Sequence, residues 1–183
     1  NDRDDSRRKK RNLTMKTYET ERLILKPTDK EDGEFIFKIM NTPKYYKYIG
    51  DRNIRTLEDA ENYITQKMMP QYEKMGFGNF TVTLKSDGSK IGFCGIYVRP
   101  SLETPDIGFA FFEEYEGKGY AYEASSLLKQ LAKDEFGLKK LSGITVEYNH
   151  SSRKLLEKLG LKFQKKFFME GAPEELMYYE TEL

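Results

Sequence analysis

The chain has 183 residues, of which 33% are charged and 14% aromatic, and its formal net charge is +1. This length fits one domain with its own core, and the composition is typical of a soluble globular protein. No run approaches the ~20 apolar residues that span a membrane, and no signal-peptide pattern is found, so we expect a cytoplasmic protein without a membrane partner.

The metal-binding and redox residues are few, because the chain has one cysteine and one histidine. Cys94 lies in an apolar run and is interpreted as a buried small hydrophobic residue, and no internal disulfide can form. A lone cysteine and a lone histidine also argue against a zinc site. We therefore expect no metal.

The net charge is unevenly distributed. Residues 1–14 contain six basic and three acidic residues, whereas the remainder contains 25 basic and 27 acidic residues. We interpret residues 1–14 as a disordered basic tail or extension, and residues 15–183 as a single domain. Because that domain is not basic, nucleic acid is not an expected partner.

The first third of the chain predicts one strand and one helix, followed by an aromatic connection. Residues 21–27 favour a strand that Pro27 ends. Thr28 and Glu31 have the spacing of a capping box. The apolar stripe that follows has helical spacing and consists of Phe35, Ile36, Ile39 and Met40. Residues 45–50 read as an aromatic connection.

A second helix and a series of strands follow. Thr56 and Asp59 suggest another capping box, before apolar positions at Leu57, Ala60, Ile64 and Met68. The Asp-Gly pair within residues 86–89 predicts a hairpin turn. The strand-like segments are 77–85, 89–98, 104–112, 140–148, 161–169 and 174–182, and the later helices run to about Phe136 and over 151–159. This order predicts an α/β domain with a mixed, largely antiparallel sheet.

Two glycines stand immediately before the helix that ends near Phe136. Its apolar positions recur at Ala124, Leu127, Leu128 and Leu131. Gly117 and Gly119 therefore fall at the first turn, where backbone N–H groups lack helical partners and attract phosphate. The spacing matches neither a P-loop nor a dinucleotide-binding fingerprint. A phosphate cradle and a plain tight turn into the helix both fit the loop in isolation.

A second group of polar residues lies at the start of the helix over 151–159. Asn149 ends the preceding strand, and Ser152 falls in the first helical turn. By local rules Asn149 or Ser151 is an N-cap and Gly160 is a C-cap.

Together these segments resemble the GNAT N-acetyltransferases, in particular the branch that includes the ribosomal-protein N-terminal acetyltransferases. The resemblance covers about residues 18–181. It rests on four segments in family order, at residues 21–25, 106–109, 117–124, and 149–152 with 156–160. It implies an α/β (α+β) fold with a mixed, largely antiparallel central sheet of about seven strands and about four flanking helices. It also implies an acetyl-CoA-dependent N-acetyltransferase.

The resemblance assigns a set of residues to acetyl-CoA or CoA. Glu116 stands where the family usually carries Gln or Arg, and Lys118 can offset its charge. The family's pantetheine arm pairs with the strand before the loop, and its pyrophosphate binds the loop amides. The implied cofactor-binding residues are Ala110, Phe111, Phe112, Glu116, Gly117, Lys118, Gly119, Tyr120, Ala121, Tyr122 and Asn149.

The implied catalytic residues are Asp106 and Ser152. Asp106 occupies the place of a family carboxylate and is a candidate base, or alternatively a solvated strand-end residue. Ser152 is a candidate acid, or alternatively only a first-turn helix residue. Leu156 stands where many members carry a tyrosine acid. A backbone N–H near Ala110 or Phe111 would stabilise the oxyanion.

The acceptor is expected to be an amine of a small molecule or of a protein N-terminus. Its groove would lie against the first two helices and the last hairpin. The candidate lining residues are Tyr45, Tyr46, Tyr48, Phe77 and Tyr178. The alternative function is a non-catalytic acyl-CoA-binding module that regulates or scaffolds another protein. The sequence is compatible with a monomer or a homodimer.

Overall fold

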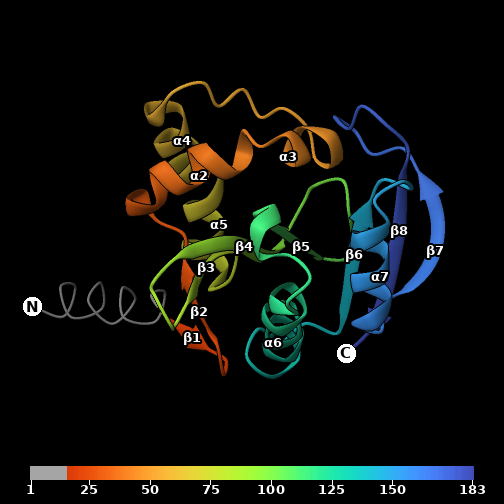
Figure 1. Cartoon of the computed structure of the whole chain (residues 1–183). Coiled ribbons are helices and arrows are strands. Elements are labelled where there is room, and N and C mark those ends of the chain that lie inside the picture. Colours follow the sequence, from red (N-terminus) through yellow and green to blue (C-terminus); the bar gives the residue numbers. More distant parts are fainter. Residues whose placement is uncertain (1–15) are drawn as a thin grey trace, which may run out of the picture.

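The computed structural model of the chain describes residues 16–183, and the predicted basic tail at residues 1–14 lies outside the described residues. Eight strands form one sheet in the order β1-β2-β3-β4-β5-β6-β8-β7 (Figure 1). Neighbours β5 and β6 are parallel, and the other neighbouring pairs are antiparallel. The predicted mixed, largely antiparallel sheet is confirmed.

The strands are β1 Tyr18–Glu19, β2 Leu23–Pro27, β3 Asn79–Leu84, β4 Lys90–Tyr97, β5 Asp106–Phe111, β6 Lys140–Thr145, β7 Lys162–Phe167 and β8 Leu176–Glu182. The α-helices are α2 Gly33–Met40, α3 Pro43–Tyr48, α4 Leu57–Tyr63, α5 Met69–Met75, α6 Tyr120–Asp134 and α7 His150–Lys158. Two 3₁₀ turns, η1 Lys30–Asp32 and η3 Glu113–Tyr115, and a π-helical turn, η2 Ile64–Met68, complete the described part.

The entry into α2 differs from the predicted capping box. The side chain of Asp29 accepts from the N–H of Glu31 at 2.9 Å, and Asp32 accepts from the N–H of Asp29 at 3.1 Å. The box therefore starts one residue later than predicted. Thr28 is buried instead, with its hydroxyl 2.9 Å from that of Thr81, so it joins β2 to β3 rather than capping a helix.

The expected aromatic connection at residues 45–50 is wrong, because most of it forms α3. The hydroxyl of Thr42 accepts from the N–H of Tyr45 at 3.2 Å and caps this short helix. Pro43 occupies the first helical turn, where a missing N–H costs nothing. A Thr-Pro pair is thus the signal for this helix.

The second predicted helix starts as expected and continues for longer. Thr56 accepts from the N–H of Asp59 at 3.0 Å, which confirms the capping box of α4. The helix then widens into η2 before α5. Pro70 explains the widening, because its ring lacks an N–H and clashes with the carbonyl four residues earlier.

Helices cover both faces of the sheet. Figure 1 shows α2 and α4 on one side and α6 on the other. Side chains alternate between the faces along β4, so that Phe93 packs with the α2–α4 cluster and Cys94 with the cluster under α6. Cys94 is fully buried, as predicted. The two cores hold the sheet rigidly between helical layers.

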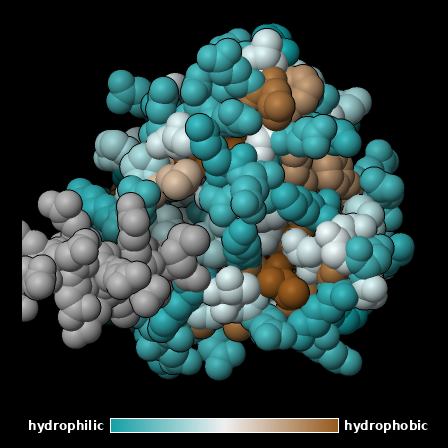
Figure 2. Space-filling view, turned by 90° about the vertical axis from the view of Figure 1, so that its left-hand side faces the viewer, coloured by the Kyte–Doolittle hydropathy of each residue, from teal (hydrophilic) through white to brown (hydrophobic). Residues whose placement is uncertain are grey.

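The outer surface is mainly polar. Figure 2 shows a face on which hydrophilic side chains predominate and hydrophobic ones occur in small separate patches. Within residues 16–183, every helix is too short or too polar to cross a membrane.

Candidate active site

The strands β5 and β6 diverge after a single paired position. Asp106 lies opposite Ser142, and this is their one register pair. On its other side β5 pairs with β4 along its whole length, from Phe111 opposite Gly92 to Asp106 opposite Tyr97. One edge of β5 is therefore free beyond Asp106, as the strand of the predicted pantetheine site requires.

The register shows which backbone groups point to that free edge. The N–H of Phe112 donates to the carbonyl of Ile91 at 3.0 Å, on the β4 side. Because antiparallel pairing alternates by residue, the backbone of Ala110 also bonds to β4, and the N–H and C=O groups of Phe109 and Phe111 face β6. This corrects the expectation for Ala110 and Phe112, and it adds Phe109, which the sequence analysis missed.

The glycine loop and the start of α6 form a cluster of free amides. The first helical bond of α6 runs from the N–H of Glu123 to the carbonyl of Gly119 at 3.0 Å. The amides of Tyr120, Ala121 and Tyr122 therefore have no partner within the helix. Gly119 has φ +81°, a left-handed conformation that favours glycine. Of the two alternatives for this loop, the free amides favour a phosphate cradle over a plain tight turn into the helix.

Arg22 braces this loop from the start of β2. Its Nη1 donates to the carbonyl of Lys118 at 3.0 Å, and its Nε pairs with Glu123 at 2.7 Å. The guanidinium also lies 4.4 Å from the ring centroid of Tyr120. The side chain of Thr20 donates to the same carboxylate at 2.5 Å. Segments 100 residues apart thus fix the conformation in which the loop presents its amides.

The acidic residue of the loop has a basic partner. Glu116 forms an ion pair with Lys44 from α3. Lys44, rather than Lys118 as predicted, therefore offsets the charge of Glu116. The pair connects the helical layer to the glycine loop.

The start of α7 supplies two more site residues. Asn149 caps the helix, its side chain accepting from the N–H of Ser152 at 3.3 Å. Leu156 is 1% exposed and packs on β6. At Gly143 an added Cβ would lie only 2.5 Å from Leu156, so this glycine allows α7 to approach the strand. Leu156, which stands at the position of the tyrosine acid implied by the family resemblance, is thus part of the core.

Asp106 is held by a guanidinium. Arg99 donates to both carboxylate oxygens, from Nε at 2.7 Å and from Nη2 at 3.2 Å. The carboxylate is 2% exposed, so it is a buried, paired group and not a solvated strand-end residue. Burial raises the pKa of Asp106 above its ordinary value, and Arg99 opposes that rise.

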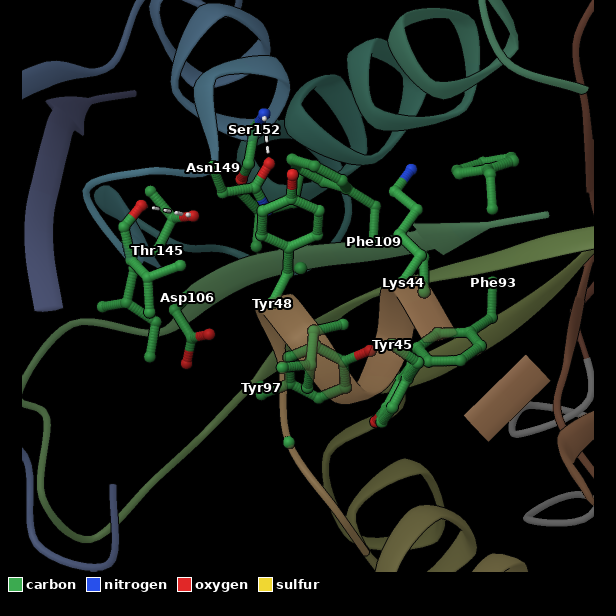
Figure 3. A pocket seen from close by; sticks show the side chains of 18 of the residues that line it. Lys44, Tyr45, Tyr48, Phe93, Tyr97, Asp106, Phe109, Thr145, Asn149 and Ser152 are labelled. Atoms are coloured by element: carbon green, nitrogen blue, oxygen red, sulfur yellow. Dashed lines mark hydrogen bonds between the residues drawn. The ribbon is translucent and has the colours of Figure 1, made fainter. Parts of the chain in front are cut away.

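One cavity of about 960 Å³ joins these features. Figure 3 shows Tyr48 from α3 near Asn149 and Ser152, with Asp106 to one side, next to Thr145. The predicted site residues that line the cavity are Tyr45, Tyr46, Tyr48, Asp106, Ala110, Phe111, Glu116, Gly117, Gly119, Tyr120, Ala121, Tyr122, Asn149 and Ser152.

Four predicted residues lie outside this cavity. Phe77 is buried and stacks on Phe136, with ring centroids 4.9 Å apart. Tyr178 is buried against β7 and donates to Glu180 at 2.6 Å. Phe112 packs on α2, and Lys118 contributes its carbonyl to Arg22. The expectations for Phe77 and Tyr178 as acceptor residues are corrected accordingly. Phe112 and Lys118, predicted to bind the cofactor, do not line the cavity.

The cavity also has basic and phenolic lining residues that no sequence pattern indicated. They include Lys44, Arg52, Tyr63, Lys67, Tyr97 and Arg99. These six side chains come from α3, α4, the π-helical turn η2, the end of β4 and two loops, which have no shared spacing. The β4–β5 register places Tyr97 opposite Asp106, and Arg99, two residues further on, reaches Asp106 only in the folded structure.

Comparisons with known proteins add to this geometry. Residues 22–162 match the family model of the acetyltransferase (GNAT) domain. The N-acetyltransferase YoaA of Bacillus subtilis, described as uncharacterized, is 27% identical over 161 residues, which cover 87% of each chain.

Two solved structures are similar in fold. The ribosomal-protein-S5-alanine acetyltransferase from Vibrio fischeri has a TM-score of 0.76 at 18% identity, covering 91% of this chain and 96% of that one. The Microcin C7 self-immunity acetyltransferase MccE, solved in complex with acetyl-CoA and AMP, has a TM-score of 0.73 at 14% identity, covering 90% and 94%.

Proposed function

Because the chain belongs to the GNAT acetyltransferase family, we propose that it moves an acetyl group from acetyl-CoA to a primary amine by direct attack, without a covalent enzyme intermediate. The amine belongs to a small molecule or a protein N-terminus. The observation that carries this proposal is the divergence of β5 and β6, whose free edge opens into the same cavity as the start of α6. Family membership supports an enzyme rather than a non-catalytic acyl-CoA-binding module.

The residues of the cavity fit acetyl-CoA, which supplies an activated thioester carbonyl. Free backbone groups of Phe109 and Phe111 suit the amide-containing pantetheine arm, as a peptide adds to a sheet edge. The amides of Tyr120 to Tyr122 suit the pyrophosphate. Nothing lies within 4 Å of the position where a side chain at Gly117 would begin, so the loop leaves room for phosphate.

Asp106 is our candidate for accepting the amine proton. A carboxylate offers about four lone-pair sites, and the two bonds from Arg99 leave the others available, directly or through a water. Because the pKa of Asp106 is raised, its carboxylate is a stronger base than that of an ordinary aspartate. The free N–H groups of Phe109 and Phe111 are candidates for stabilising negative charge on the reacting carbonyl oxygen.

Ser152 is our candidate proton donor to the departing thiolate. Its hydroxyl lies in the first turn of α7, and Tyr48 shares that part of the cavity (Figure 3). We expect Ser152→Ala to lower kcat about 100-fold with unchanged CoA affinity, because general acid catalysis contributes roughly 10²–10⁴-fold. Single-turnover rates measure the effect. Tyr48→Phe is the matched variant, and a larger loss there would assign the donor to Tyr48 instead.

The proposed function is tested by calorimetry with acetyl-CoA and CoA, followed by thiol release over a panel of primary amines. We expect binding of both nucleotides and amine-dependent release of CoA. Absence of acetyl-CoA binding would contradict the site assignment. Tight binding without turnover of any amine would instead support the non-catalytic alternative.

A further inference from the structure

The end of the cavity away from the glycine loop carries excess positive charge. Arg52 comes from the segment after α3, Lys67 from η2, and Arg99 from the segment after β4. Asp106 neutralises Arg99 with its two hydrogen bonds. Among the ion pairs within residues 16–183, none involves Arg52 or Lys67, although the nearby Arg55 pairs with Asp51. At this end of the cavity Arg52 and Lys67 therefore have no carboxylate partner in the described part. The other cationic lining residues without an ion pair there, Lys47, Lys154 and Lys158, come from α3 and α7.

The two arginines lie around one buried phenol. Tyr45 is 5% exposed, and burial raises its pKa while Arg52 and Arg99 both oppose that rise. Burial and the nearby Arg99 both act to lower the pKa of Arg52, whereas Tyr45 and Tyr63 raise it above its ordinary value. Like charges in a partly desolvated cavity are unfavourable without a counter-ion. This end of the cavity is thus suited to an anion.

Apart from Asp106, the acidic lining residues come from other segments of the chain. Glu170 and Glu174 line the cavity from the loop between β7 and β8, which Figure 1 places beside α3 and away from α4. Glu174 accepts from the hydroxyl of Tyr148 at 2.6 Å. One wall is therefore acidic and another basic, a pattern complementary to a molecule with a cationic amine and a separate anionic group.

We propose that the acceptor is an amine that also carries an anionic group, a carboxylate or a phosphate, and that Arg52 binds this group. The proposal rests on the proposed acetyl transfer and names its substrate class. A guanidinium binds carboxylates and phosphates through two parallel N–H bonds, so Arg52 provides orientation as well as charge. Lys67 contributes a second positive charge. An acceptor without the anion leaves Arg52 without an anionic partner and is a poorer substrate.

The first experiment compares acceptors that differ only in the anion. Thiol release is measured with phosphoethanolamine against ethanolamine, with L-amino acids against their C-terminal amides, and with peptides beginning Ser-Glu against Ser-Gln. We expect kcat/KM to be about 10- to 100-fold higher for the anionic member of the favoured pair. This is the factor that one hydrogen bond to a charged group contributes. The peptide pair separates a protein N-terminus from the two kinds of small molecule.

The second experiment tests Arg52 itself. We expect Arg52→Gln to lower kcat/KM for the anionic acceptor about 10- to 100-fold, to change the neutral acceptor less than about 3-fold, and to leave the Kd of CoA unchanged. Arg52→Lys should keep part of the preference, because it keeps the charge but loses the paired bonds. Arg55→Gln is the matched control, since Arg55 pairs with Asp51 outside the cavity lining and should behave as wild type.

The outcomes separate the two proposals. Turnover of amines without preference for an anion, or an equal loss for both acceptors in Arg52→Gln, would overturn the assignment of the acceptor class and leave acetyl transfer intact. Binding of acetyl-CoA without turnover of any amine would overturn the proposed function, and this inference with it.

Discussion

At the scale of single residues, the neighbour Arg99 influences both the orientation and the ionisation of Asp106. Its position at the last paired point of β5 and β6 brings it to the cavity, and Arg99 holds both oxygens there. Burial raises its pKa, whereas Arg99 favours its ionised form. Arg99 thus favours the ionised form that the proposed base requires, against the effect of burial.

This balance predicts the pH dependence of Arg99→Gln. If ionised Asp106 is the base, activity is lost as the pH falls through its pKa. Removing Arg99 leaves burial unopposed, so the pKa rises and the acidic limb of kcat/KM moves to higher pH. The pH profile of kcat/KM for one amine, wild type against variant, measures the shift. An unmoved limb would show that another group accepts the proton.

Arg22 is a second residue whose importance is visible only in three dimensions. We expect Arg22→Gln to weaken CoA binding about 3- to 10-fold, because the loop loses its bond to the carbonyl of Lys118 and its ion pair, both partly exposed to solvent. Calorimetry with CoA measures the change. Lys85→Gln, which breaks an exposed ion pair with Glu19 outside the cavity lining, is the control. Equal Kd values for all three proteins would contradict the bracing role.

At the scale of elements, the strand, glycine loop and helix of residues 106–134 form the functional unit. The divergence of β5 frees an edge, and the left-handed glycines direct the chain into α6 with its first amides exposed. Each part is ordinary alone. Their adjacency places the free strand edge and the free amides of α6 beside one cavity, as the proposed cofactor site requires.

The role of the loop can be separated from the strain of its glycines. Gly117 and Gly137 have φ +74° and +67°, and nothing lies within 4 Å of an added Cβ at either. Alanine at each should therefore cost a similar ~1–2 kcal/mol of folding stability. We expect only Gly117→Ala to weaken CoA binding, by 10-fold or more. Thermal unfolding and calorimetry measure the two effects. Similar CoA binding in both variants would exclude residue 117 from the phosphate site.

At the scale of the whole molecule, the cavity lies between segments from both ends of the sheet. The hydroxyl of Tyr148, before α7, lies 3.1 Å from the carbonyl of Lys47 in α3 and 2.6 Å from Glu174 in the last hairpin. Its ring also lies 5.9 Å from that of Tyr48. This contact joins the helical layer to the C-terminal strands across the acceptor end of the cavity.

Removing that hydroxyl should affect the acceptor and not the donor. We expect Tyr148→Phe to raise the KM of the amine about 2- to 5-fold, because the single phenolic proton that lies between Glu174 and the carbonyl of Lys47 is lost, a hydrogen bond worth roughly 0.5–1.5 kcal/mol. The Kd of CoA should not change. Steady-state kinetics with one amine and calorimetry with CoA measure both. A change confined to CoA affinity would place the link at the donor end instead.

Much of the fold could be predicted because its signals are local. The Asp-Gly turn, the capping box of Thr56 and the apolar stripe of α2 act over a few residues and appear in the structure as expected. The helix α3 was missed although its Thr42-Pro43 start is equally local. The capping box of η1 was placed one residue early, because Thr28 is drawn into a buried hydrogen bond that no local rule contains.

The sequence by itself determined the order of the main strands and of most helices, the glycine loop and the resemblance to the GNAT family, since these depend on residues close together in the chain. Only the tertiary structure decided that Arg99 binds Asp106, that Lys44 pairs with Glu116, and that Phe109 and Phe111 face the free edge of β5. The tertiary structure likewise places Phe77 in the core and Arg52 in the lining of the cavity. The physical reason is that burial, charge pairing and strand register arise between distant segments, whose approach is set by the packing of the whole sheet.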